Sequence, residues 1–139
     1  MPVRFHQIIK TRIDNKKELK LFLEKMLSKS GQNHFELDII FCDDQYLLDI
    51  NRRFLKHDYY TDIITFDLSD SNDFLKAELY ISGEMVSENA KNQLVSFKNE
   101  IHRVIFHGVL HLLGYTDKTA SKKVEMRKME DIWLSLYFG

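Results

Sequence analysis

The fold of this chain is decided by residues 97–117, which read FKNEIHRVIFHGVLHLLGYTD. Ser96 precedes this stretch as a helix N-cap, and Gly114 stands where glycine ends a helix by taking the left-handed conformation. Between them, apolar side chains occur almost all round the helix, which is typical of a buried helix. They are Phe97, Ile101, Val104, Ile105, Phe106, Val109, Leu110, Leu112 and Leu113. The pattern predicts a central helix from 97 to 113 with the rest of the chain packed around it.

The same helix carries His107 and His111, which are four residues apart and therefore lie on one face. The turn at Gly114 brings Asp117 within reach of both rings. Two buried imidazoles need polar partners, because unpaired polar groups cost free energy inside a protein. Two histidines and a carboxylate fill three positions of a tetrahedral zinc and leave the fourth for water, as in catalytic zinc sites. We therefore expect one Zn²⁺ per chain.

Other interpretations of this motif remain. A histidine pair at helical spacing alone more often reflects packing than metal binding, and it is the glycine and the carboxylate that favour a metal here. Metzincin proteases share the spacing, but they carry a glutamate directly after the first histidine as general base, where this chain has Gly108. Two histidines and one carboxylate also form the non-haem iron triad, although no accompanying feature indicates oxygen chemistry.

Length and composition indicate a single globular domain over residues 1–139. Apolar residues make up 44% and charged residues 29%, which is ordinary for a soluble protein. The apolar runs are too short to cross a membrane, and the start of the chain does not resemble a signal peptide. The single cysteine, Cys42, cannot form an internal disulfide and fits a reducing compartment. We expect a cytoplasmic protein without a membrane partner.

The net charge of −1 does not favour a nucleic-acid partner, because such binding depends on Lys and Arg neutralising phosphates. Any nucleic-acid surface must therefore be a local patch. Two patches are candidates, although each taken alone is better explained as a solvated helix face. They are Arg52, Arg53, Lys56 and His57, and Lys118, Lys122, Lys123, Arg127 and Lys128.

Hydrophobic periodicity predicts the remaining elements. Strands are expected near 2–9, 35–41, 62–68 and 77–82, and helices near 15–29, 44–56, 84–95 and 119–137. The mixed order of strands and helices indicates an α+β fold. We expect a single small mixed sheet of about four strands, covered by helices, with the histidine-bearing helix buried at the centre.

Three segments together resemble the YbeY family: HGVLHLLGYTD (107–117), LLDINRRFLKHDYYTDIITFDL (47–68) and AELYISGEMV (77–86). Asn51 and the run from Asp58 to Phe66 are further anchors of this resemblance. Members of the family are bacterial zinc-containing endoribonucleases linked to ribosomal RNA maturation and ribosome quality control. The resemblance implies a metal-dependent endoribonuclease that acts on 16S ribosomal RNA with a zinc-activated water. It also implies the ribosomal small subunit as partner and no DNA substrate.

The chain departs from the family pattern at three places. Asp117 stands where the family usually has a third histidine, and a carboxylate is an accepted zinc ligand. Leu55 replaces a basic residue that the family associates with RNA cleavage, which leaves Arg53 or Lys56 to supply positive charge. Ala77-Glu78 replaces a Gly-Asp pair, so the acid is kept and the turn residue is lost.

Cleavage of RNA also needs groups that stabilise charge on the phosphorus, normally a positioned cation. Arg53, Lys56 and His57 are the catalytic candidates, and their alternative is an exposed helix end followed by a turn. Glu100 lies about two turns before His107 and is expected to accept an imidazole N–H, as partners of metal-bound histidine do.

Two other functions stay open from the sequence alone. One is a ribosome-associated binding factor in which the metal only stabilises the fold. The other is a zinc hydrolase of another substrate, such as a peptide.

Overall fold

The central helix, α4 (Phe97–Leu112), organises the computed structural model, which describes residues 2–139. Its start is capped by Ser96, whose hydroxyl accepts the Asn99 N–H at 3.0 Å. Its end passes into Gly114, which has a φ of +102° and so needs the freedom of glycine. Most side chains between these ends are buried, so the prediction of a buried helix is confirmed.

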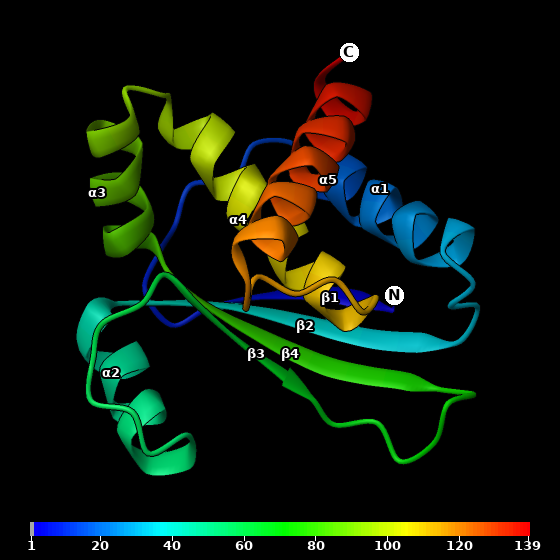
Figure 1. Ribbon diagram of the computed structural model, residues 1–139, viewed down its shortest axis with the longest axis horizontal. Coiled ribbons are helices and arrows are strands. Elements are labelled where there is room, and N and C mark those ends of the chain that lie inside the picture. Colours follow the sequence, from blue (N-terminus) through cyan, green and yellow to red (C-terminus); the bar gives the residue numbers. More distant parts are fainter. Residues whose placement is uncertain (1) are drawn as a thin grey trace.

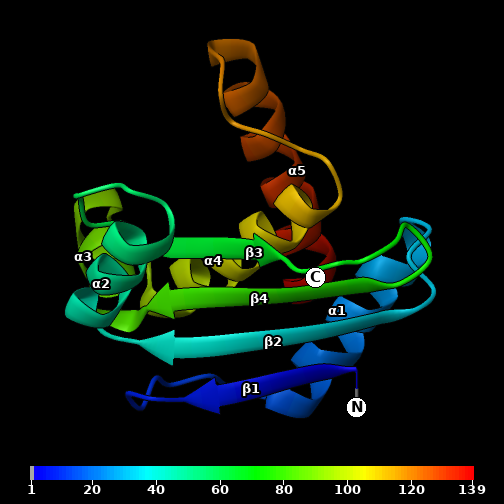
Figure 2. The same cartoon turned by 90° about the horizontal axis from the view of Figure 1, so that it is seen from below.

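Four strands form one mixed sheet in the order β1-β2-β4-β3 (Figure 2). They are β1 (Val3–Gln7), β2 (Phe35–Cys42), β3 (Ile63–Asp67) and β4 (Leu75–Ser82). The β1–β2 and β2–β4 pairs are parallel, whereas β3 pairs antiparallel with β4. The predicted small mixed sheet is confirmed, and β3 is its edge strand beside the histidine-bearing helix.

Helices cover the two faces of the sheet unequally (Figure 1). On one face, α1 (Lys16–Lys29) and α4 pack on alternate strand residues such as Ile39, Leu79 and Ile81, while α3 (Gly83–Gln93) and α5 (Ala120–Phe138) flank α4. On the other face lies α2 (Asp44–Phe54), which packs through Leu47 and Ile50. The α2 face therefore keeps a small separate core and leaves room for a cavity.

The helix predicted over 44–56 extends beyond the C-terminal end of the observed helix. Helix α2 stops at Phe54, and Lys56 takes a left-handed backbone conformation with φ of +59°. The carbonyl of Asn51 accepts both the Leu55 and the His57 N–H at 3.1 Å, which closes the helix and starts the next loop. No helix within residues 2–139 combines the length and the apolar character that a membrane span requires.

Gly108 allows α4 to lie directly against the sheet. A Cβ atom placed there would come within 2.7 Å of Ile63 Cδ1 and 2.9 Å of Leu79 Cδ1. Such distances are shorter than van der Waals contact, and Leu79 is completely buried. Because Gly108 follows His107, this close approach sets the distance between the histidine face and the edge strand.

Gly108→Val is expected to lower the free energy of unfolding by about 1–3 kcal/mol, because a branched side chain overpacks the contact with Ile63 and Leu79. Urea unfolding monitored by circular dichroism measures this change. Lys123→Val, at an exposed position of α5, is the control for the helix propensity of valine. Equal stability of the two variants would contradict the close-approach argument.

Candidate metal centre

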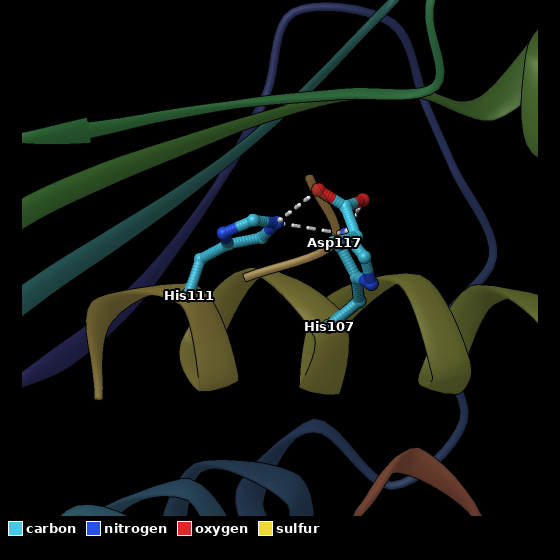
Figure 3. A group of neighbouring side chains, drawn as sticks. All are labelled: His107, His111 and Asp117. Atoms are coloured by element: carbon cyan, nitrogen blue, oxygen red, sulfur yellow. Dashed lines mark hydrogen bonds and ion pairs between the residues drawn. The ribbon is translucent and has the colours of Figure 1, made fainter. Parts of the chain in front are cut away.

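His107, His111 and Asp117 converge on one point (Figure 3). The two rings rise from the same side of α4, and the loop that follows Gly114 carries the Asp117 carboxylate over them. The two Nε2 atoms are 3.1 Å apart, and the Asp117 oxygens lie 3.6 Å from His107 Nε2 and 3.8 Å from His111 Nε2. The predicted triad is thus brought together by the structure.

These distances fit a bound metal ion. Tetrahedral zinc with ligand bonds of about 2.0–2.1 Å holds its ligand atoms roughly 3.3 Å apart, close to the spacing of the three atoms here. The lone pairs of two unprotonated imidazole nitrogens and a carboxylate that face one point also repel each other unless a proton or a metal cation lies between them. The donor set suits zinc and other borderline metals, with room for water as a further ligand.

Glu130 of α5 orients His107 for this role. Its Oε2 accepts the His107 Nδ1 proton at 2.6 Å, which leaves Nε2 as the free nitrogen that faces the triad. Glu130 is only 5% exposed and is held in turn by Arg103 Nη1 at 3.0 Å. Arg103 also binds the more exposed Asp131 at 2.7 Å. An Arg103–Glu130–His107 chain therefore fixes the ring.

The prediction that Glu100 contacts a metal-site imidazole is wrong for His107, since Glu130 takes that position. Glu100 is 4% exposed and lies beside a polar cavity of about 280 Å³ behind His107. Its Oε2 accepts a bond from Gln93 at 3.5 Å, and its Oε1 accepts none within residues 2–139. Burial raises the pKa of Glu100, although the nearby Arg103 opposes the shift.

The surroundings shift the pKa values of the two histidines in opposite directions. Burial alone would lower the pKa of His107, but the hydrogen bond and the charge of Glu130, together with the charges of Asp117 and Asp62, outweigh it and raise the pKa. Burial lowers the pKa of His111, and the positive charge of His107 lowers it further.

A cleft of about 500 Å³ opens beside the triad. Its walls are α4, the edge strand β3 and the loop between α2 and β3. Asn51, whose side chain is almost completely buried, anchors this loop by donating to the Tyr59 carbonyl at 2.9 Å. Leu55 lines the cleft, so the position where the family pattern has a basic residue presents an apolar wall here.

Of the three predicted catalytic residues, His57 is the one that the structure places in this cleft. The Tyr59 hydroxyl lies 2.9 Å from His57 Nδ1, and the two rings stack with centroids 5.1 Å apart. Arg53 instead lines a second cavity on the other side of α2. Lys56 is exposed on the left-handed turn.

Asp62 is a cleft residue that sequence reasoning assigned only to the start of a strand. It lies between the cleft and the polar cavity behind His107, and Asn89 Nδ2 donates to it at 3.3 Å. Burial raises the pKa of Asp62, while the charge of His107 opposes the shift. Its only signal in the sequence was its place in the Asp58–Phe66 run.

Glu130→Gln is expected to weaken metal binding about 10- to 100-fold, because the neutral amide no longer fixes the His107 ring as a carboxylate does. Competition with a chromophoric chelator measures the zinc dissociation constant. Asp131→Asn is the matched control, since Asp131 also binds Arg103 but does not touch His107. Equal zinc affinity of wild type and Glu130→Gln would contradict the assigned role.

The comparisons with known proteins agree with this architecture. A protein from Cytophaga hutchinsonii named endoribonuclease YbeY is 44% identical over 132 residues, covering 95% of this chain and 92% of that protein. A Flavobacterium psychrophilum protein of the same name is 42% identical over 116 residues, covering 84% and 82%. A solution structure from Thermotoga maritima superposes with a TM-score of 0.67 at 25% identity, covering 99% and 89%.

A family model described as endoribonuclease YbeY matches residues 5–137. This match includes every helix and strand that builds the cleft and the triad. The chain therefore belongs to the YbeY endoribonuclease family.

Proposed function

We propose that this chain is a metal-dependent endoribonuclease that cleaves single-stranded RNA, with one zinc ion held by His107, His111 and Asp117. The observation that carries the proposal is the convergence of these three donors at the wall of a cleft of about 500 Å³. Three protein ligands leave a position for water, as in catalytic zinc sites. Membership of a family named for endoribonuclease activity supports RNA as the substrate.

When bound, the metal supplies a Lewis acid that polarises a phosphoryl oxygen and lowers the pKa of water. The protein must then hold the ligands and move protons. Glu130 accepts a hydrogen bond from the His107 Nδ1–H, which holds the proton on Nδ1 and keeps Nε2 available as a ligand. Because Glu130 is itself bound by Arg103, its carboxylate is not free to turn toward the substrate.

His57 is the proton-transfer group of this proposal. Tyr59 engages its Nδ1, so Nε2 is the nitrogen left to face a phosphate in the cleft. A protonated Nε2 can donate to the departing oxygen or to a charged phosphoryl oxygen. Arg53 and Lys56, which lie outside this cleft, are assigned to binding RNA rather than to cleavage.

The proposed biological substrate is ribosomal RNA, with a role in 16S maturation and ribosome quality control and the small subunit as partner. The YbeY resemblance supports this part of the proposal. A ribosomal substrate would require the protein to act in the cytoplasm. We expect no activity on DNA.

One observation favours a second candidate, a metal-braced factor that binds the ribosome without cleaving RNA. The cleft carries the apolar Leu55 and the carboxylates of Asp62 and Asp67 beside the triad, an acidic setting for a phosphate. In this reading the metal only fixes the Asp117 loop against α4. Cleavage assays separate the two candidates.

His111→Ala is expected to slow cleavage of purified single-stranded ribosomal RNA by at least about 100-fold, because the loss of a ligand removes the Lewis acid. A time course of zinc-loaded wild type and of the variant, purified identically, measures this change. Contaminating nucleases would appear in both preparations. Equal cleavage, or none in either, would refute the nuclease proposal and favour the binding factor, for which ribosome co-sedimentation is the next assay.

His57→Ala is expected to slow cleavage by about 100-fold or more while zinc affinity stays unchanged, because His57 moves a proton but binds no metal. Cleavage rate and zinc affinity are measured on the same preparation. His34→Ala, at an exposed position before β2, is the control. Undiminished cleavage by His57→Ala would remove His57 from the mechanism.

A further inference from the structure

A second cavity lies on the face of the sheet opposite the metal cleft. It has a volume of about 450 Å³ and is enclosed by α2 and by the outer sides of β3 and β4. Figure 1 shows α2 on this face, with α1, α4 and α5 on the other. Cavities of about 300–1,000 Å³ commonly hold small ligands or parts of larger ones. Nothing in the proposed cleavage step uses this space.

Aromatic rings form the walls of this cavity. Tyr46 of α2 and Tyr80 of β4 face each other with ring centroids 6.4 Å apart and planes inclined by 23°. Phe66 of β3 meets Tyr80 edge-on at 5.8 Å. Tyr46 remains 39% exposed, so its ring is accessible from solvent. Accessible rings of this kind stack with nucleobases.

Charged groups complete the cavity and make it more than an apolar groove. Asp49 and Arg53 line it from α2, and Glu78 lines it from β4. The Tyr80 hydroxyl donates to Glu78 Oε1 at 3.0 Å, which orients the carboxylate. Oε2 and the second lone pair of Oε1 remain to accept hydrogen bonds from a ligand. Burial and the neighbouring Glu78 raise the pKa of Tyr80 to about 12, so this hydroxyl remains a donor at neutral pH.

This combination of aromatic rings and charged groups suits a nucleotide as ligand. Among the four RNA bases it suits guanine best. Single-stranded RNA bases are recognised by stacking on aromatic rings and by hydrogen bonds to their Watson–Crick edge. A carboxylate offers only acceptors, and guanine presents two adjacent donors on that edge, whereas uracil presents carbonyl oxygens on either side of its N–H. Arg53 supplies a cation for a neighbouring phosphate.

The cavity and the proposed reaction site lie on opposite sides of the same two elements, β3 and the end of α2. Along β3, Thr65 and Asp67 line the metal cleft, whereas Phe66 between them lines the second cavity. At the end of α2, Phe54 lines the second cavity and Leu55 lines the metal cleft. An RNA strand that crosses the sheet edge here would reach both sites.

We propose that this cavity binds a guanine base of the RNA substrate, stacked against Tyr46 and Tyr80 and read by Glu78. The inference rests on the proposed nuclease function and extends it by giving the substrate a base preference next to the cut site. It also gives Arg53 a role in RNA binding, since Arg53 lines this cavity rather than the metal cleft.

Titration of the zinc-loaded, ¹⁵N-labelled chain with GMP, AMP, CMP and UMP, followed by NMR, tests this proposal. We expect GMP to shift the amide signals of α2 and of residues 66–80, and to bind at least about tenfold more tightly than UMP. Phosphate binding at the metal would be common to all four nucleotides, so the difference between bases reports on the cavity. Glu78→Gln should remove most of the GMP preference. Glu36→Gln, on the same sheet face but outside the cavity, should not change it.

The proposal is overturned if no nucleotide shifts the cavity residues, if shifts occur only at the metal cleft, or if Glu78→Gln keeps the full GMP preference. Should Glu78→Gln misfold, Tyr46→Leu takes its place, because it removes an exposed stacking ring and keeps an apolar wall. Binding is measured without cleavage. The cleavage assay therefore tests the nuclease proposal, and the nucleotide titration tests this inference separately.

Discussion

The burial of α4 is the constraint on which the rest of the structure depends. Its sequence is apolar almost all round, so sheet and helices must enclose it, and Gly108 lets it touch Ile63 and Leu79 directly. The sequence predicted two buried imidazoles, whereas the side chains of His107 and His111 are 22% and 30% exposed, so they are only partly shielded from water at the edge of this enclosure. Glu130 satisfies Nδ1 of His107, and the Nε2 atoms of both rings face the Asp117 carboxylate. The cation that we propose at this site would complete the arrangement.

The triad could be predicted because its members lie within eleven residues on one helix and the turn that follows. Helical spacing and the glycine break determine their geometry without knowledge of the tertiary structure. Glu130 could not be found in this way, since it meets His107 only after α5 packs on α4. Its one signal was its spacing of four residues from Met126 and from Leu134, which marks the buried side of α5.

The basic segment after α2 shows why the cleft was harder to predict than its metal ligands. Arg53 and His57 are four residues apart and would share one face of a continuous helix. The helix ends at Phe54, however, and Lys56 takes a left-handed backbone that its side chain does not signal. The two residues consequently line different cavities. Among the described residues that line the metal cleft there is no arginine or lysine, so neutralising the charge of a reacting phosphate would fall mainly to the proposed metal. Arg53 lies in the other cavity, away from that phosphate.

A crystal structure of the zinc-loaded protein, with anomalous diffraction at the zinc edge, tests the central claim most directly. The account predicts one zinc ion bound by Nε2 of His107, Nε2 of His111 and the carboxylate of Asp117, with water as the remaining ligand. His107 Nδ1 should still contact Glu130. A fourth protein ligand, or a zinc ion elsewhere in the chain, would contradict an open catalytic site.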